Sequence, residues 1–123
     1  MKKLLMRTCF VILCLFVTQF AFAECVSTYE LIADTQVTTK RGSLCAITVI
    51  TDGTNDARVI LYDVGAVGDI AVTNKLMEIT VKGADNYGGR IFDSGNNVQF
   101  TEGVYADINN AGGGAGSFIV ETK

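Results

Sequence analysis

The sequence contains no histidine, no proline and no tryptophan. Histidine is the usual acid–base residue near neutral pH and the commonest zinc ligand. Its absence therefore excludes Ser–His–Asp triads, HExxH zinc sites and ordinary zinc fingers. The missing tryptophan weakens the case for a sugar-binding platform built on indole rings. No serine lies in a G-x-S-x-G nucleophile elbow. We therefore expect that the protein is not an enzyme, with no catalytic residues and no cofactor.

The first 23 residues have the three parts of a secretory signal peptide. A head with three Lys and Arg residues precedes an apolar run from Cys9 to Phe22, and residues 21–23 form a small-x-small ending. The apolar run is shorter than the roughly 20 residues that cross a bilayer, which argues against the alternative of an uncleaved membrane anchor. We expect cleavage near Ala23. This leaves one domain, 24–123, that is secreted to the periplasm or the extracellular space.

The exported part is more acidic than the whole chain. The full sequence has 10 Lys and Arg residues against 13 Asp and Glu residues, a net charge of −3. Three of the basic residues and none of the acidic ones lie in 1–23, so 7 remain against 13 and the net charge becomes −6. An acidic domain without a basic stripe repels phosphate backbones. We therefore expect no nucleic-acid partner, no polybasic membrane contact and no membrane insertion of the mature chain.

Two of the four cysteines lie in the expected signal peptide, which leaves Cys25 and Cys45. Two cysteines in an exported domain most simply pair with each other. On the chain-entropy model, closing this loop stabilises the fold by about 3 kcal/mol. Two free thiols or a redox pair are the alternatives, but no CxxC spacing supports the redox pair.

Short alternating segments separated by turn residues run through the mature chain. They are rich in β-branched residues and recur every 8–12 residues or so, a spacing typical of antiparallel sandwiches and barrels. A first strand is expected over 26–32 and 35–39, with a break at Asp34. Further strands are expected at 44–51, 57–63, 74–82, 90–93, 98–101, 103–108 and 117–122. We expect 64–72 to be a loop with a weak strand, and 83–89 to be a turn. The sequence therefore predicts an all-β fold, a small antiparallel β-sandwich of about seven or eight strands, jelly-roll-like or immunoglobulin-like.

Alternation also predicts which side chains form the core, because successive strand residues point to opposite faces. In 74–82 the face with Met77, Ile79 and Val81 is the better candidate. The full set of expected core residues is Ile47, Val49, Val59, Leu61, Met77, Ile79, Val81, Ile91, Phe100, Val104, Ile108, Phe118 and Val120.

Two polar loops are the candidate ligand sites. The first contains Asp52, Asn55 and Asp56, and the second contains Asp85 and the tyrosine of a glycine-rich stretch, Tyr87. Carboxylate and amide oxygens of this kind are calcium ligands. However, the loops lack the D-x-[DN]-x-[DN]-G spacing of a calcium loop, and aspartate and asparagine are also the ordinary turn residues. We favour the turn interpretation and expect no metal ligands.

Four stretches carry a resemblance to a known group of proteins: VILYDV (59–64), KLMEITVKGADNYGGRIF (75–92), VQFTEGVYADI (98–108) and GAGSFIVET (114–122). Together they resemble a family of short β-sandwich proteins found among tailed-phage and viral structural proteins. In that family an LYD strand is followed by a GVY-D strand, a glycine-alanine turn and a final IV strand. The resemblance implies a non-catalytic capsid-decoration or fibre-like role, and no functional residues can be carried over from it.

Export, the strand pattern and the absent catalytic groups together predict a secreted, non-enzymatic structural or surface-interaction protein. Self-assembly, and association with a virion or a cell surface, are the forms this role would take, so a protein partner or a second copy is expected. The alternative is a soluble module that binds a carbohydrate or calcium through the loops around 52–56 and 85–90.

Overall fold

In the computed structural model the chain is described over residues 24–92, 96–110 and 116–123. The expected signal peptide, 1–23, lies outside these residues. Within them, no helix is long and apolar enough to span a membrane.

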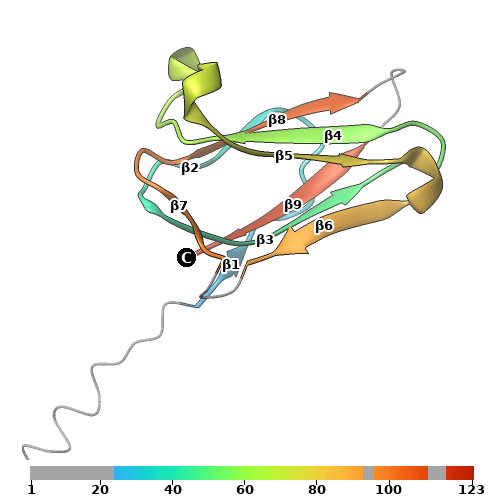
Figure 1. Cartoon of the computed structure of the whole chain (residues 1–123), viewed down its shortest axis with the longest axis horizontal. Coiled ribbons are helices and arrows are strands. Elements are labelled where there is room, and N and C mark those ends of the chain that lie inside the picture. Colours follow the sequence, from blue (N-terminus) through green and yellow to red (C-terminus); the bar gives the residue numbers. More distant parts are fainter. Residues whose placement is uncertain (1–23, 93–95, 111–115) are drawn as a thin grey trace, which may run out of the picture.

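Two antiparallel sheets account for the described strands (Figure 1). Sheet A has the order β1-β9-β3-β6, and β7 also pairs with β3; sheet B has the order β2-β8-β4-β5. The strands are β1 (Val26–Ser27), β2 (Thr35–Thr38), β3 (Gly42–Ile50), β4 (Ala57–Tyr62), β5 (Lys75–Val81), β6 (Tyr87–Ile91), β7 (Val98–Phe100), β8 (Val104–Asn110) and β9 (Ser117–Thr122). Short 3-10 helices are η1 (Val67–Asp69), η2 (Val72–Asn74) and η3 (Gly83–Asp85). The predicted all-β fold with two antiparallel sheets is confirmed.

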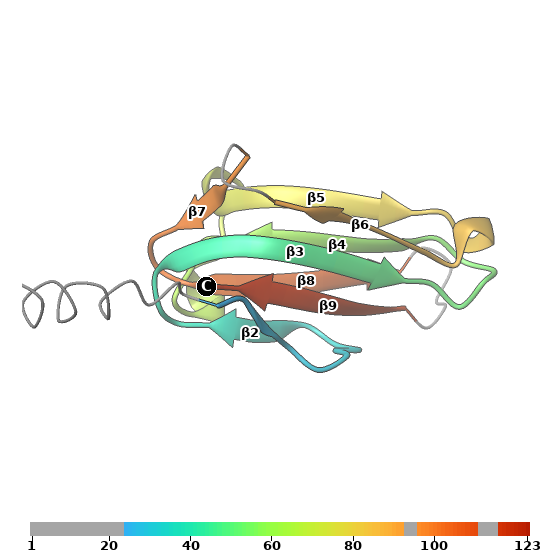
Figure 2. The same cartoon turned by 90° about the horizontal axis from the view of Figure 1, so that it is seen from below.

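The sheets stack as two layers, with β4, β5 and β8 over β3, β6 and β9 (Figure 1). The β3–β4 and β5–β6 connections lie together at one end of the sandwich, and the C-terminus lies at the other. Figure 2 shows β5 and β6 next to each other along one side of the molecule, where the edges of the two sheets approach.

The core is built from the alternating residues of the central strands. Ile47 and Val49 of β3 are buried, and Phe118 and Val120 of β9 pack beside them. Their β-branched or aromatic side chains suit a pleated, half-buried surface. The rest of the buried cluster is Leu44, Ala57, Val59, Leu61, Val81, Phe100, Val104 and Ala106. Met77, Ile79 and Ile108, which were predicted as core, are partly buried and pack against this cluster.

One predicted core residue is wrong. Ile91 is 85% exposed. It pairs with Ala46 of β3, and the neighbouring Ile47 points into the core, so Ile91 lies on the opposite, outer face of sheet A. Since β6 is an edge strand, nothing in sheet A lies beyond it to cover the side chain.

The predicted turn over 83–89 is also only partly right. The turn is η3 with Asn86, whose φ is +60°, but Tyr87 already begins β6. The glycines at 88 and 89 serve close packing within the strand. A Cβ at Gly88 would lie 2.8 Å from Val81 Cγ2, and one at Gly89 would lie 2.1 Å from the Ile47 carbonyl oxygen.

Two connections differ from expectation. The segment 64–72 contains no described strand and instead forms η1 and the start of η2. The expected first strand, 26–32 and 35–39, divides between the sheets: β1 pairs with β9 in sheet A, and β2 pairs with β8 in sheet B. A break at Asp34 was expected, but a change of sheet depends on packing that local sequence does not encode.

The structure pairs Cys25 with Cys45, with their Cα atoms 6.1 Å apart, as predicted. The bond joins the segment before β1 to β3. It lies where the pairing of β3 with β9 shifts register, between Leu44 and Ala46. Because β1 adds only two residues to the edge of the sheet, this covalent link strengthens the attachment of the start of the described chain, which hydrogen bonds from Thr28 and Leu31 to β9 also hold.

Candidate functional site

The two polar loops singled out in the sequence lie side by side at one end of the sandwich. The Thr51 amide donates a hydrogen bond to the Asn86 carbonyl at 2.7 Å, and the Thr51 hydroxyl lies 3.1 Å from the carbonyls of Gly83 and Asn86. The two loops pack so closely that a Cβ atom added at Gly83 would lie 2.4 Å from the Thr54 carbonyl carbon. Asp52, Asn55 and Asp56 are thus brought beside the turn that carries Asp85.

Asp52 holds its own loop together. One carboxylate oxygen accepts the backbone N–H groups of Thr54, at 2.9 Å, and Asn55, at 2.7 Å. The other accepts the Asn55 side-chain amide at 2.9 Å. This arrangement is an Asx turn, which the favoured interpretation of the sequence predicted.

Asp56 links the two loops. Its carboxylate pairs with the Lys82 ammonium at 2.6 Å and accepts the Gly83 amide at 3.1 Å. The hydrogen bond from Lys82, with that from Gly83, lowers the pKa of Asp56. No group of three or more acidic or cysteine side chains among the described residues is arranged to hold a metal ion. The oxygens of Asp52 and Asp56 therefore stabilise the loops.

Tyr87 belongs to a different surface. In β3 the buried Ile47 and Val49 alternate with Ala46, Thr48 and Ile50, which point outward. Their partners across the sheet share that side: Ile91 faces Ala46, Gly89 faces Thr48 and Tyr87 faces Ile50. On the other side of β3, Ile119 of β9 faces Thr48.

Together these residues place several apolar side chains on the outer side of sheet A, beside the polar Thr48 and Glu121, and we call this surface the apolar face. Its apolar members are Ala46, Ile50, Tyr87, Ile91 and Ile119. Tyr87 is 70% exposed and Ile91 is 85% exposed. Sequence reasoning identified Tyr87 but missed the other four. The alternation of Ala46, Thr48 and Ile50 could have indicated an apolar outer side for β3, but the position of Ile91 depends on the pairing of β6 with β3.

A shallow hollow adjoins the apolar face between β6 and β7. Its volume is about 370 Å³, and it is lined by Arg90, Ile91, Phe92, Asn96 and Val98. Arg90 takes part in none of the ion pairs found among the described residues. The β6–β7 hollow thus offers apolar walls and one guanidinium group.

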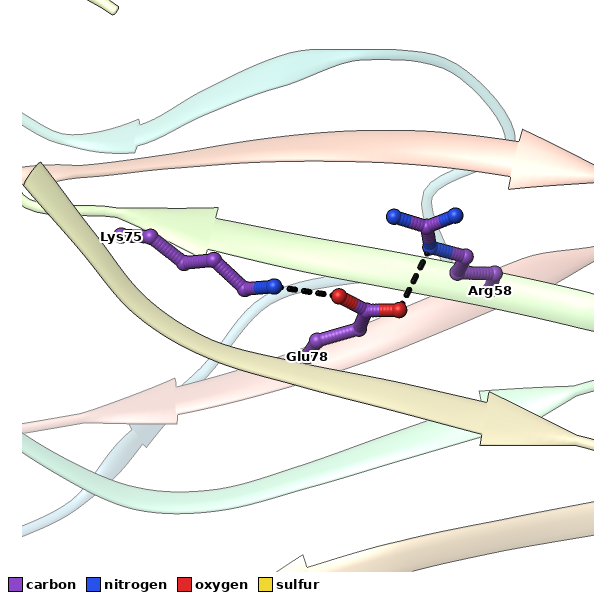
Figure 3. Close-up of polar contacts among 3 residues, drawn as sticks. All are labelled: Arg58, Lys75 and Glu78. Atoms are coloured by element: carbon purple, nitrogen blue, oxygen red, sulfur yellow. Dashed lines mark hydrogen bonds and ion pairs between the residues drawn. The ribbon is translucent and has the colours of Figure 1, made fainter. Parts of the chain in front are cut away.

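The outer face of sheet B has a contrasting, charged character. Glu78 of the edge strand β5 lies between Arg58, at 2.8 Å from its Nε, and the Lys75 ammonium (Figure 3). The hydrogen bond from Lys75 is the largest influence on the pKa of Glu78 and lowers it. Desolvation raises this pKa, but the charges of Arg58 and Lys75 also lower it, and the net shift is downward. Charges on an edge strand discourage pairing with another chain.

Further along the same sheet, Asp107 of β8 carries a raised pKa. Burial is the main cause, the nearby Asp34 adds to it and Arg58 opposes it. Charged groups thus occupy the exposed side of sheet B on β4, β5 and β8. The apolar face of sheet A has no comparable row of ion pairs among the described residues.

Comparisons with protein-family models, curated proteins and solved structures find no match to this chain.

Proposed function

We propose that the protein is an exported, non-enzymatic structural or surface-interaction module that associates with further copies of itself through the apolar face. One observation carries the proposal. Tyr87 and Ile91 stand 70% and 85% exposed on the same side of β6, where they flank outward-pointing residues of β3. Several exposed apolar side chains on one face favour an interaction site, whereas single exposed apolar residues are ordinary.

The energetic argument favours contact over exposure. Fully burying a side chain such as Ile91 gains about 1.5–3 kcal/mol, and the apolar face presents several such side chains on a rigid sheet. Because the sheet is already formed, association costs little ordering of the backbone. Sheet B lacks this advantage, since its Arg58–Glu78–Lys75 group would lose solvation on burial.

Export fits the covalent structure. A disulfide such as Cys25–Cys45 forms and persists in oxidising compartments outside the cytosol. Together with the signal-peptide pattern of 1–23, it supports a role in the periplasm or the extracellular space. A fibre-like or decorating subunit, as the resemblance to phage and viral structural proteins implies, is one form of this proposal.

The alternative, a loop-based site for calcium or a carbohydrate, has less support. The carboxylates of Asp52 and Asp56 already accept hydrogen bonds from their own loops and from Lys82. Tyr87 lies on the strand beside Ile50, as part of the apolar face. We therefore base the proposal on sheet A.

Sedimentation of the chain 24–123 over a range of concentrations tests the proposal. The wild type should associate, and the pair of substitutions Tyr87→Ser and Ile91→Ser should leave it monomeric. The matched control is Tyr29→Ser with Ile32→Ser, which changes the same residue types at exposed positions outside the apolar face. A wild type that is monomeric throughout, or association that survives the Tyr87 and Ile91 changes, would overturn the proposal.

A further inference from the structure

A second exposed apolar feature precedes β5, on the sheet B side of the molecule. Between β4 and β5 the chain forms η1 and η2, and Val67 and Val72 there are 61% and 89% exposed. We call residues 66–74 the protrusion. Figure 1 shows it as the yellow-green coil that stands out from the sheet B side. Its two valines flank one carboxylate in the sequence, that of Asp69.

Backbone contacts hold the protrusion in shape. The Asp69 amide donates to the Ala66 carbonyl at 3.1 Å, and the Asn74 amide donates to the Ala71 carbonyl at 3.0 Å. The Asn74 side-chain amide closes the segment by donating to the Asp69 carbonyl at 3.1 Å. The exposed valines are therefore displayed on a preorganised support, which lowers the entropic cost of docking.

The β6–β7 hollow is complementary to the protrusion in both polarity and charge. Its volume is about 370 Å³, and Ile91, Phe92 and Val98 line it. Apolar side chains that displace water from the hollow gain from burial. Arg90 at the same hollow supplies the cation that would meet the Asp69 carboxylate of an incoming protrusion.

We propose that the protrusion of one copy docks into the β6–β7 hollow of the next, with Asp69 opposite Arg90. The inference rests on the proposed self-association. It names the segment of the second copy that docks beside the apolar face. The contact joins two different surfaces, so a pair of copies joined once keeps one free protrusion and one free hollow. Repetition of such a contact builds a chain of subunits, an open filament where the rotation does not close a ring.

Charge exchange between the two surfaces gives the test. Asp69→Arg places two cations at the contact, and Arg90→Asp places two anions there. Each variant alone should lose association by about tenfold or more, since like charges facing each other at an interface are strongly unfavourable. When the two variants are mixed in equal amounts, each protrusion again meets a hollow of opposite charge, and sedimentation should show association restored. The double variant Asp69→Arg with Arg90→Asp should likewise associate by itself.

The matched control is Asp85→Arg, the same change at another exposed aspartate outside the protrusion, which should associate as the wild type does. Melting temperatures close to that of the wild type show that each variant is folded. The inference is overturned if either single variant associates normally, or if mixing restores nothing. If the Tyr87 and Ile91 variant loses association but the Asp69 and Arg90 variants associate normally, the protrusion does not take part in the contact. The proposed association through the apolar face is then still supported.

Discussion

The Asp63 carboxylate accepts the Thr101 amide on both of its oxygens, each at 2.9 Å. The Thr101 hydroxyl adds a third contact at 3.1 Å, and the amides of Glu102 and Gly103 also donate to the same carboxylate. One side chain just after β4 thereby holds the connection between β7 and β8, which links sheet B to sheet A.

Asp63 predicts an acid-sensitive contribution to stability. Partial burial acts to raise its pKa, but the amides of Glu102, Thr101 and Gly103 and the Thr101 hydroxyl together outweigh burial, so the pKa is lowered. A pKa that is lower in the folded state stabilises the fold above the unfolded value of about 4, and this stability is lost as the pH falls through the folded pKa.

Asp63→Asn should therefore lower the free energy of unfolding near neutral pH by about 1–2 kcal/mol and flatten its dependence on acid pH. Urea unfolding at a series of pH values measures both effects. Asp85→Asn, at an exposed aspartate, is the control and should change little. If the free energy of unfolding of the wild type does not decrease at acid pH, the prediction is wrong.

Gln36 provides a second, uncharged anchor. Its side-chain amide nitrogen lies 2.7 Å from the Thr38 carbonyl and 3.0 Å from those of Val64 and Val104. Gln36→Met keeps the length of the side chain but leaves these carbonyls without their donor, and should cost about 2 kcal/mol of stability. Gln99→Met, on the exposed side of β7, should cost much less. Equal losses in chemical denaturation would show that the Gln36 contacts contribute nothing.

Gly89 should be intolerant of any side chain. A Cβ there would lie 2.1 Å from the Ile47 carbonyl oxygen, so Gly89→Ala forces β6 away from β3 and should destabilise the fold by about 3 kcal/mol or more. At Gly68 nothing lies within 4 Å of the added atom, and Gly68→Ala should melt close to the wild type. Similar melting temperatures for the two variants would contradict the described pairing of β3 with β6.

Calcium should not stabilise the protein. Asp52 accepts hydrogen bonds from its own loop and Asp56 pairs with Lys82, so millimolar calcium should leave the melting temperature equal to that in magnesium. A rise specific to calcium that disappears in Asp56→Ala would instead support the loop-based ligand site.

The strands that were easiest to predict are those whose local pattern agrees with their environment. Ser117–Thr122 begins and ends where the sequence indicated, and the core positions of β3, β4 and β9 follow from alternation. The cysteine pairing followed from counting. The loops around Asp52 and Asp85 were two separate candidates in the sequence, and the structure places them side by side.

The apolar face could not be predicted because it depends on pairing between distant segments. Gly88 and Gly89 have the composition of a turn, yet they lie in β6, where Gly89 packs so closely on β3 that a Cβ would lie 2.1 Å from the Ile47 carbonyl oxygen. The sequence predicts a strand here only from residue 90 onward, and a segment this short does not show which of its faces points to the core. Only the register of β6 on β3 shows that Ile91 faces outward beside Ala46.

Side-chain footprinting with hydroxyl radicals tests the central claim most directly. Tyr29 and Tyr87 are both exposed in the single chain, at 92% and 70%, so Tyr29 serves as the internal reference for Tyr87. As the protein concentration rises, oxidation of Tyr87 and Ile91 should fall while oxidation of Tyr29 stays constant. A ratio of Tyr87 to Tyr29 oxidation that does not change with concentration would contradict association through the apolar face.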